Sequence, residues 1–289
     1  LFDYPLTLPQ LRRSLIGVAA TDRDIRSVHQ RHTGLREAVA CAHGYFFPRG
    51  HDWMIDERWR REVRSRRFLA DHRRFLRWLC AMPYVRMVAL SGSVAHLNLV
   101  EGGDLDLFIV VRGPHVWSVT VAAIVLARLM GVRRQVCANF TVADSSLAME
   151  PHDLFTASQI IHLVPLSGRD VWDEVRDANP FVARFFPNVD GPAGDDQAFQ
   201  LTPAMKVSAE LERWLDRPAA ALEAICRSAY RWYLGRRSRT WSSAAAVQLS
   251  DDRLKLHTHS HRGPVLQRFA DQRRDREVRT RTPPVSKAS

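Results

Sequence analysis

The segment that most constrains the fold of this chain runs from 85 to 111, where two apolar runs are joined by residues that suit chemistry better than packing. The first run ends on a Ser-Gly-Ser turn that contains Gly92 and Ser93, and small residues there let the backbone approach a bound group such as a phosphate. Ten residues separate Ser93 from Asp104, and the apolar run after Asp106 is typical of a buried strand. The segment therefore predicts two strands with a glycine turn and a pair of acids between them.

Asp104 and Asp106 point to the same face of an extended chain, because side chains alternate along a strand and only Leu105 separates them. Two carboxylates held this close repel each other unless a cation lies between them. Mg²⁺ is the expected ion, with Mn²⁺ as an alternative, since Mg²⁺ binds a few carboxylates and completes its shell with water and substrate phosphates. We therefore predict that Asp104 and Asp106 are metal ligands and that Gly92 and Ser93 bind a nucleotide.

This pattern of Gly92-Ser93, ten residues and then Asp104-x-Asp106 resembles the signature of the nucleotidyltransferase superfamily that includes DNA polymerase β. The whole chain is similar to a set of bacterial nucleotidyltransferase-domain proteins, which join an N-terminal helical or winged module to this core and to a helical section. The resemblance implies an α+β fold whose small mixed sheet, the palm, carries the site. It also implies an enzyme that transfers a nucleoside monophosphate from a nucleoside triphosphate to an acceptor hydroxyl, with Mg²⁺-dependent release of pyrophosphate. The sequence does not identify the acceptor.

The expected third strand, 135–142, departs from the superfamily pattern. The resemblance implies a third carboxylate there, which holds a second metal and helps to deprotonate the acceptor. The sequence offers Asn139, which we take as the third catalytic candidate although an amide carries no charge and cannot act as a base. The nearest acid downstream is Asp144. This departure favours an alternative function, in which a catalytically impaired fold senses nucleotide and regulates by binding DNA or protein.

Other interpretations of the motif exist. A Gly-Ser pair after a strand is common in α/β proteins, and Asp-x-Asp also occurs in surface turns and in metal-dependent glycosyltransferases. In those glycosyltransferases the acids follow a whole nucleotide-binding half, which the sequence before Asp104 does not show.

Residues 1–56 predict a winged-helix-like module, a type of domain that often binds DNA. Its helices are expected over 8–15, 21–30 and 35–43, and its hairpin strands over 45–47 and 53–55. The third helix has only one arginine, so a packing or partner-binding module is an equal alternative.

Residues 57–82 predict a long basic linking helix that starts near Asp56. Its expected apolar face consists of Trp59, Val63, Phe68, Leu69, Phe75, Leu76 and Leu79. The arginines Arg58, Arg61, Arg64 and Arg67 are candidates for phosphate contacts, or else form a solvated face with i,i+4 pairs to Glu62 and Asp71.

Residues 83–188 predict the palm with its packing helices, and 189–271 a C-terminal helical section. Aromatic residues within 210–237 have helical spacing, which indicates core packing more than a platform for a base. Three alternating histidines at 257, 259 and 261 are a weak zinc candidate, and 272–289 is expected to be disordered.

Composition adds two constraints. The net charge of +11 across 289 residues suits a nucleotide, phosphate or nucleic-acid partner, although only three of the 42 basic residues are lysine. The four cysteines are widely spaced in apolar settings, which predicts reduced core residues in a cytoplasmic protein. The chain opens on Leu1 without a recognisable signal peptide, as expected if its first residues are missing, and its most apolar helix is too short and interrupted to cross a membrane.

Overall fold

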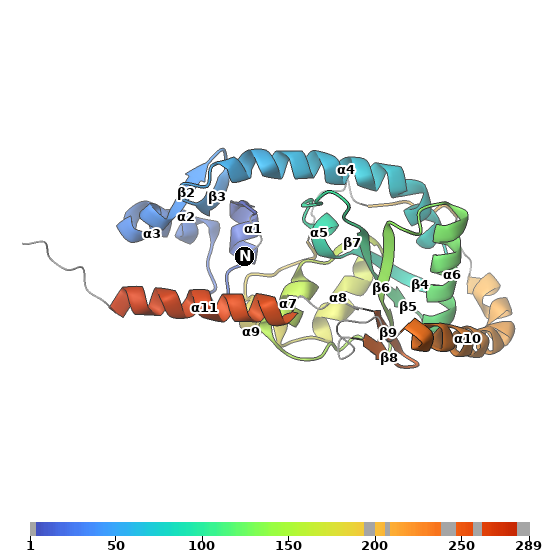
Figure 1. Ribbon diagram of the computed structural model, residues 1–289. Helices are drawn as coiled ribbons and strands as arrows, with labels where there is room; N and C mark the ends of the chain where they lie inside the picture. Colours follow the sequence, from blue (N-terminus) through green and yellow to red (C-terminus); the bar gives the residue numbers. More distant parts are fainter. Residues whose placement is uncertain (1–3, 194–199, 206–208, 238–246, 257–261, 282–289) are drawn as a thin grey trace, which may run out of the picture.

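The computed structural model describes residues 4–193, 200–205, 209–237, 247–256 and 262–281. The chain folds as a mixed α+β protein in which a six-stranded sheet is packed between helices (Figure 1). A second, smaller sheet belongs to the N-terminal residues.

The larger sheet has the strand order β7-β4-β5-β6-β9-β8. Its strands are β4 (Val85–Leu90), β5 (Leu105–Val111), β6 (Val136–Ala143), β7 (Val164–Ser167), β8 (Val247–Leu249) and β9 (Arg253–Leu256). β5 and β6 are parallel and the other neighbours are antiparallel, so the sheet is mixed, as expected. The first three strands begin and end within about two residues of the ranges expected from the sequence.

Helices cover both faces of this sheet (Figure 1). Leu105, Leu107 and Ile109 point to one face, where they pack in a core with α4 (Trp53–Leu79), α6 (Val116–Leu129) and α10 (Ala209–Arg237). Phe108 and Val110 point to the other face, where they pack with α7 (Leu154–Ile161), α8 (Arg169–Asp177) and α9 (Val182–Phe185). The alternation of side chains along β5 thus supplies two separate cores, one on each side of the sheet.

The N-terminal elements differ in detail from the expected winged module. They are β1 (Leu6–Thr7), α1 (Leu8–Arg13), α2 (Asp22–Arg31), α3 (Thr33–Ala38), β2 (Val39–Ala42) and β3 (Tyr45–Pro48). The hairpin forms between β2 and β3, so residues 39–42 are a strand and not the end of the third helix. The second expected hairpin strand, 53–55, is instead the first turn of α4, because Met54 and Ile55 are buried against Phe47. Whether the module binds DNA stays a prediction.

Helix α4 connects these elements to the sheet along one edge of the molecule (Figure 1). Phe75, Leu76 and Leu79 are buried as expected, but Trp59 and Val63 are 46% and 69% exposed, so the first half of the expected apolar face is wrong. Glu62 pairs with Arg66 at the expected i,i+4 spacing.

The C-terminal section is not wholly helical, because β8 and β9 form a hairpin that extends the sheet beside β6. The expected core packing of α10 holds for Tyr230 and Leu234, which pack in the core shared with α6, but Trp214 and Trp232 are 74% and 61% exposed. Residues 272–281, expected to be disordered, belong to helix α11 (Arg262–Arg281). The histidines at 257, 259 and 261, and residues 282–289, lie outside the described residues.

None of the four cysteines forms a disulfide, as expected, but they do not share one environment. Cys80 is buried, Cys41 is exposed, and Cys137 and Cys226 are half-buried. The expectation of four core cysteines therefore holds for Cys80 alone. Within the described parts of the chain, no helix has both the length and the apolar character needed to cross a membrane.

Candidate functional site

The turn between β4 and α5 (Gly92–Ala95) lies directly against Asp106. Gly92 has φ +62°, a left-handed conformation that favours glycine. A Cβ at Gly92 would overlap the Asp106 carboxylate and lie 3.1 Å from its Cγ. The Ser91 amide donates a hydrogen bond of 2.9 Å to the Asp106 carbonyl. The glycine therefore lets the backbone turn pass close to the acid.

The two aspartates occupy the start of β5, at the edge where that strand enters the sheet. Leu105 and Leu107 are buried in the core beneath α4 and α6, and Asp106 points to the opposite face, on the side of Phe108. The Leu105 amide donates a 2.7 Å hydrogen bond to the Gln135 carbonyl, which ties the start of β5 to the segment before β6. Both carboxylates are half-buried.

Cys137 of β6 completes a cluster with the two aspartates. One carboxylate oxygen from Asp104, one from Asp106 and the Cys137 sulfur all lie within 4.8 Å of one another. Cys137 is in register with Asp106 across the parallel pair of strands. Among the described residues this is the one group of three or more such ligands close enough to hold a metal ion.

Cys137 was not predicted as a ligand, because the third position depends on the register between two strands. The pairing shifts between Asp106 and Phe108, where Cys137 and Phe140 are the successive partners on β6. One extra residue on β6 places Cys137 opposite Asp106. Asn139, two residues further along the same strand, is the residue that counting along the sequence selected. A thiol on the predicted third strand was the signal that could have found Cys137.

Asp144 is not part of the cluster. It follows the last residue of β6, whereas Cys137 lies near the first, and six residues of strand span about 20 Å. Its carboxylate accepts hydrogen bonds from Arg86 and from the Gly113 amide, at 3.2 and 3.0 Å. We therefore exclude Asp144 as the third acid, because it stabilises the opposite end of the sheet.

Helix α4 braces the loop between Ser93 and Asp104. Arg61 donates to the Asn98 side chain and Arg64 to the Leu99 carbonyl, both at 3.1 Å, and the Leu99 amide donates to Ser65 Oγ. Two of the four arginines proposed for phosphate contacts therefore hold this loop in place.

Arg58, the third of those arginines, is buried and also structural. It donates to the Pro5 carbonyl and lies over the rings of Tyr4 and Tyr45, at 4.4 and 4.5 Å from their centroids. Only Arg67 of the four is exposed. The expectation that this set meets phosphates is thus wrong for Arg58.

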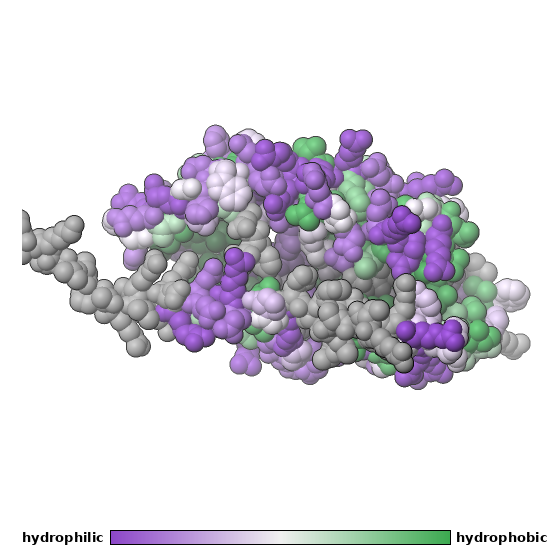
Figure 2. All heavy atoms as spheres, viewed as in Figure 1, coloured by the Kyte–Doolittle hydropathy of each residue, from purple (hydrophilic) through white to green (hydrophobic). Residues whose placement is uncertain are grey.

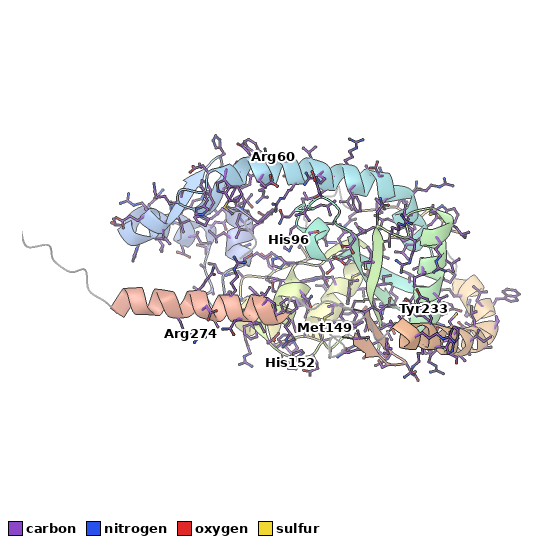
Figure 3. The ribbon with its side chains drawn as sticks, in the orientation of Figure 1. Arg60, His96, Met149, His152, Tyr233 and Arg274 are labelled. Atoms are coloured by element: carbon purple, nitrogen blue, oxygen red, sulfur yellow. The ribbon has the colours of Figure 1, made fainter. Side chains whose placement is uncertain are left out.

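A histidine of this loop, His96, packs against His162 at the end of α7. The rings of His96 and His162 lie 4.4 Å apart, and Figure 3 shows His96 between α4 and α7. Burial lowers the pKa of His96 to about 4, and burial together with the His96 charge lowers the pKa of His162. Both rings are therefore neutral near pH 7, and the Tyr4 hydroxyl donates to the His96 carbonyl at 2.6 Å.

A recess opens beside the cluster on the face of the sheet covered by α7. Its walls are formed by Ser91, Asp106, Leu107, Phe108, Phe140, Met149, Gln159, Ile160 and Leu163. The walls of the recess are therefore apolar apart from the side chains of Ser91 and Asp106 and the amide of Gln159.

Lys255 of β9 brings a positive charge to this region. Its ammonium nitrogen lies 5.4 Å from the centroid of the Phe140 ring, which is one wall of the recess. Burial is the main cause that lowers the Lys255 pKa, with the charges of Arg262 and Arg253 as smaller causes. The sequence analysis missed Lys255 because it assigned no strand to residues 247–256.

The cluster fits a divalent cation on two grounds. Its donors are two carboxylates and a thiol, which are groups that bind divalent metals when ionised. Metal–ligand bonds of about 2.0–2.3 Å let two ligands of one ion lie up to about 4.5 Å apart, so the ligand atoms of the cluster are already close to that limit. The close approach of Gly92 to Asp106 places the backbone turn directly beside these ligands.

Comparisons with known proteins add no relative. No family model and no curated protein matches the sequence, and no solved structure matches the fold.

Proposed function

We propose that the chain is a metal-dependent nucleotidyltransferase, which transfers a nucleoside monophosphate from a nucleoside triphosphate to an acceptor hydroxyl. The single observation that carries this proposal is the contact between the Gly92 turn and Asp106, beside a cluster that also contains Asp104. A backbone turn that can face phosphates and a carboxylate pair that can hold their metal are the two parts that phosphoryl-group transfer needs in one place.

Each residue has a separate role in this proposal. Asp104 and Asp106 hold the cation, and the backbone at Gly92 with the Ser93 hydroxyl orients the triphosphate. A cation bound there neutralises charge on the phosphates. The acceptor oxygen forms a bond to the α-phosphorus, the bond from that phosphorus to the bridging oxygen breaks, and pyrophosphate leaves. The proton of the acceptor hydroxyl passes to water.

The test measures pyrophosphate release from each of the four nucleoside triphosphates, with Mg²⁺, Mn²⁺, Zn²⁺ or Co²⁺ and a mixture of hydroxyl-bearing acceptors. We expect Asp104→Asn and Asp106→Asn each to lower the rate by about 10²-fold or more, because each removes a charged ligand. Asp71→Asn is the matched control, since it makes the same change on the exposed face of α4. Full activity in both cluster variants would contradict the assignment of Asp104 and Asp106 as metal ligands in this reaction.

A second candidate function rests on the third position of the cluster. The superfamily pattern has a carboxylate there, whereas this chain has Cys137 beside the two aspartates and Asn139 further along β6. In this candidate the fold senses nucleotide without turnover and binds nucleic acid. The arginines Arg60, Arg66, Arg67, Arg73, Arg74 and Arg77 lie exposed on α4.

Hydrophilic side chains gather along α4 (Figure 2), and Figure 3 labels Arg60 on this helix. Gel-shift assays at two salt concentrations separate the candidates, because phosphate contacts weaken steeply as salt rises. Salt-sensitive binding that Arg67→Ala with Arg74→Ala reduces, without pyrophosphate release, favours the second candidate. Turnover without such binding favours the first.

A further inference from the structure

The third side chain of the cluster is a thiol, and its position is fixed by the sheet. Cys137 lies in register with Asp106, and its sulfur is within 4.8 Å of an oxygen of each aspartate. At Cys137 β6 pairs with its parallel partner β5, and from Phe140 to Val142 it also pairs with its antiparallel partner β9. The sulfur therefore projects from a central strand and not from a loop that could carry it away.

The donor set of two oxygens and one sulfur does not suit all divalent ions equally. Mg²⁺ takes oxygen ligands in near-octahedral geometry, and a thiolate is a poor partner for it. Zn²⁺ and Co²⁺ accept carboxylate and thiolate together, and they bind a given mixed site more tightly than Mn²⁺ does. A cluster with Cys137 in the third place therefore discriminates among ions that a cluster of three carboxylates would bind.

We propose that Cys137 is the third ligand of the cation site and makes the site selective for Zn²⁺ or Co²⁺ over Mg²⁺. The inference rests on the proposed function in one respect, since both use Asp104 and Asp106 as ligands. Binding releases one proton: the Cys137 thiol loses its hydrogen, the sulfur forms a bond to the metal, and the proton passes to water.

The test uses Co²⁺ as the probe, because a thiolate bound to Co²⁺ gives a charge-transfer absorption in the near ultraviolet that oxygen ligands do not give. The full chain titrated with Co²⁺ is expected to show this band, and Cys137→Ser is expected to lose it with about a tenfold or greater loss of affinity. Cys41→Ser is the matched control, because Cys41 is exposed in the N-terminal hairpin, and it should keep the band.

Two further measurements protect the test against a simple loss of folding. Zn²⁺ should slow alkylation of Cys137 by iodoacetamide in the wild-type chain and leave alkylation of Cys41 unchanged. Cys137→Asp should restore an oxygen ligand, so that Mg²⁺ binding rises while the Co²⁺ band disappears. A wild-type chain without the band, or equal Co²⁺ affinity in Cys137→Ser, overturns the proposal.

The outcomes also separate this inference from the proposed function. If the aspartate variants lose pyrophosphate release while Cys137→Ser keeps the wild-type preference among metals, the function stands and the selectivity fails. If the band requires Cys137 but no metal supports pyrophosphate release, the ligand assignment stands and the function fails.

Discussion

Replacing Gly92 by alanine tests the link between the turn and the carboxylate cluster most directly. Gly92 has φ +62°, and an alanine in the left-handed region costs about 1–2 kcal/mol. The added Cβ would also overlap Oδ2 of Asp106 and lie 3.1 and 3.3 Å from its Cγ and Cβ. The Asp106 carboxylate must therefore rotate and the side chain must shift slightly, at a further cost of about 1–3 kcal/mol.

Gly113→Ala is the matched control for this experiment. Gly113 has φ +57°, and nothing lies within 4 Å of the position that its Cβ would take. It follows β5, at the end of the sheet remote from Asp106. The two variants thus share the backbone strain, and only Gly92→Ala displaces the acid.

Urea unfolding followed by tryptophan fluorescence is expected to show a loss of about 1–2 kcal/mol for Gly113→Ala and about 2–5 kcal/mol for Gly92→Ala. Electron paramagnetic resonance of Mn²⁺ measures the site itself. We expect Mn²⁺ binding close to wild type in Gly113→Ala and weakened in Gly92→Ala, since the added Cβ turns the Asp106 carboxylate away from its position in the cluster. Equal stability losses together with unchanged Mn²⁺ binding in both variants would refute the reasoning.

Two further predictions concern stability. The pKa of His96 and of His162 is lowered by burial, so the unfolded chain binds more protons below about pH 6.5 and stability should fall as the pH drops from 6.5 towards 4. For His96 the loss of unfolding free energy at about pH 5 is at most about 2 kcal/mol. Urea unfolding measures this free energy at about pH 5 and about pH 7.5, and its difference between the two pH values should be smaller for His96→Leu than for wild type. Asn179→Ala should cost about 2–4 kcal/mol, because the buried amide accepts from the Met149 amide at 2.7 Å and donates to the Leu147 and Val175 carbonyls. A loss below about 1 kcal/mol in the same assay would contradict the assignment of Asn179 as a structural hydrogen-bonding centre.

The central strands and the helices α4, α6 and α10 could be predicted from the sequence because their signals are local. β5 is an unbroken apolar run after Asp106, and α6 is an apolar stretch that ends just before Gly131. A run of this kind depends on neighbours a few residues away, so its position can be read from one segment alone.

The features that were missed depend on contacts between distant segments. β7 and β9 have four residues each, too few for a period to stand out, and they become strands because β4 and β6 offer unpaired edges. The exposure of Trp59 depends on which part of α4 packs against the rest of the protein. The sequence of α4 alone does not show this.

The candidate site divides in the same way. Asp104 and Asp106 share a face because of a spacing of two along one strand, which the sequence contains. Cys137 joins them through the register between β5 and β6, where one extra residue on β6 decides which side chain lies opposite Asp106. Cys137 can be recognised as a neighbour of the two aspartates only when the pairing of β6 with β5 is known.

The pairing of β9 with β6 has a consequence for how shortened forms of this protein should be interpreted. The hairpin of β8 and β9 is anchored by Trp117, which donates to the Ser250 carbonyl, and by Arg253, which donates to the Ala148 carbonyl. A chain cut before Val247 would leave the strand that bears Cys137 with one bare edge, open to association with another molecule. Loss of activity after such a cut would therefore report damage to the centre of the protein, and not the removal of an accessory tail.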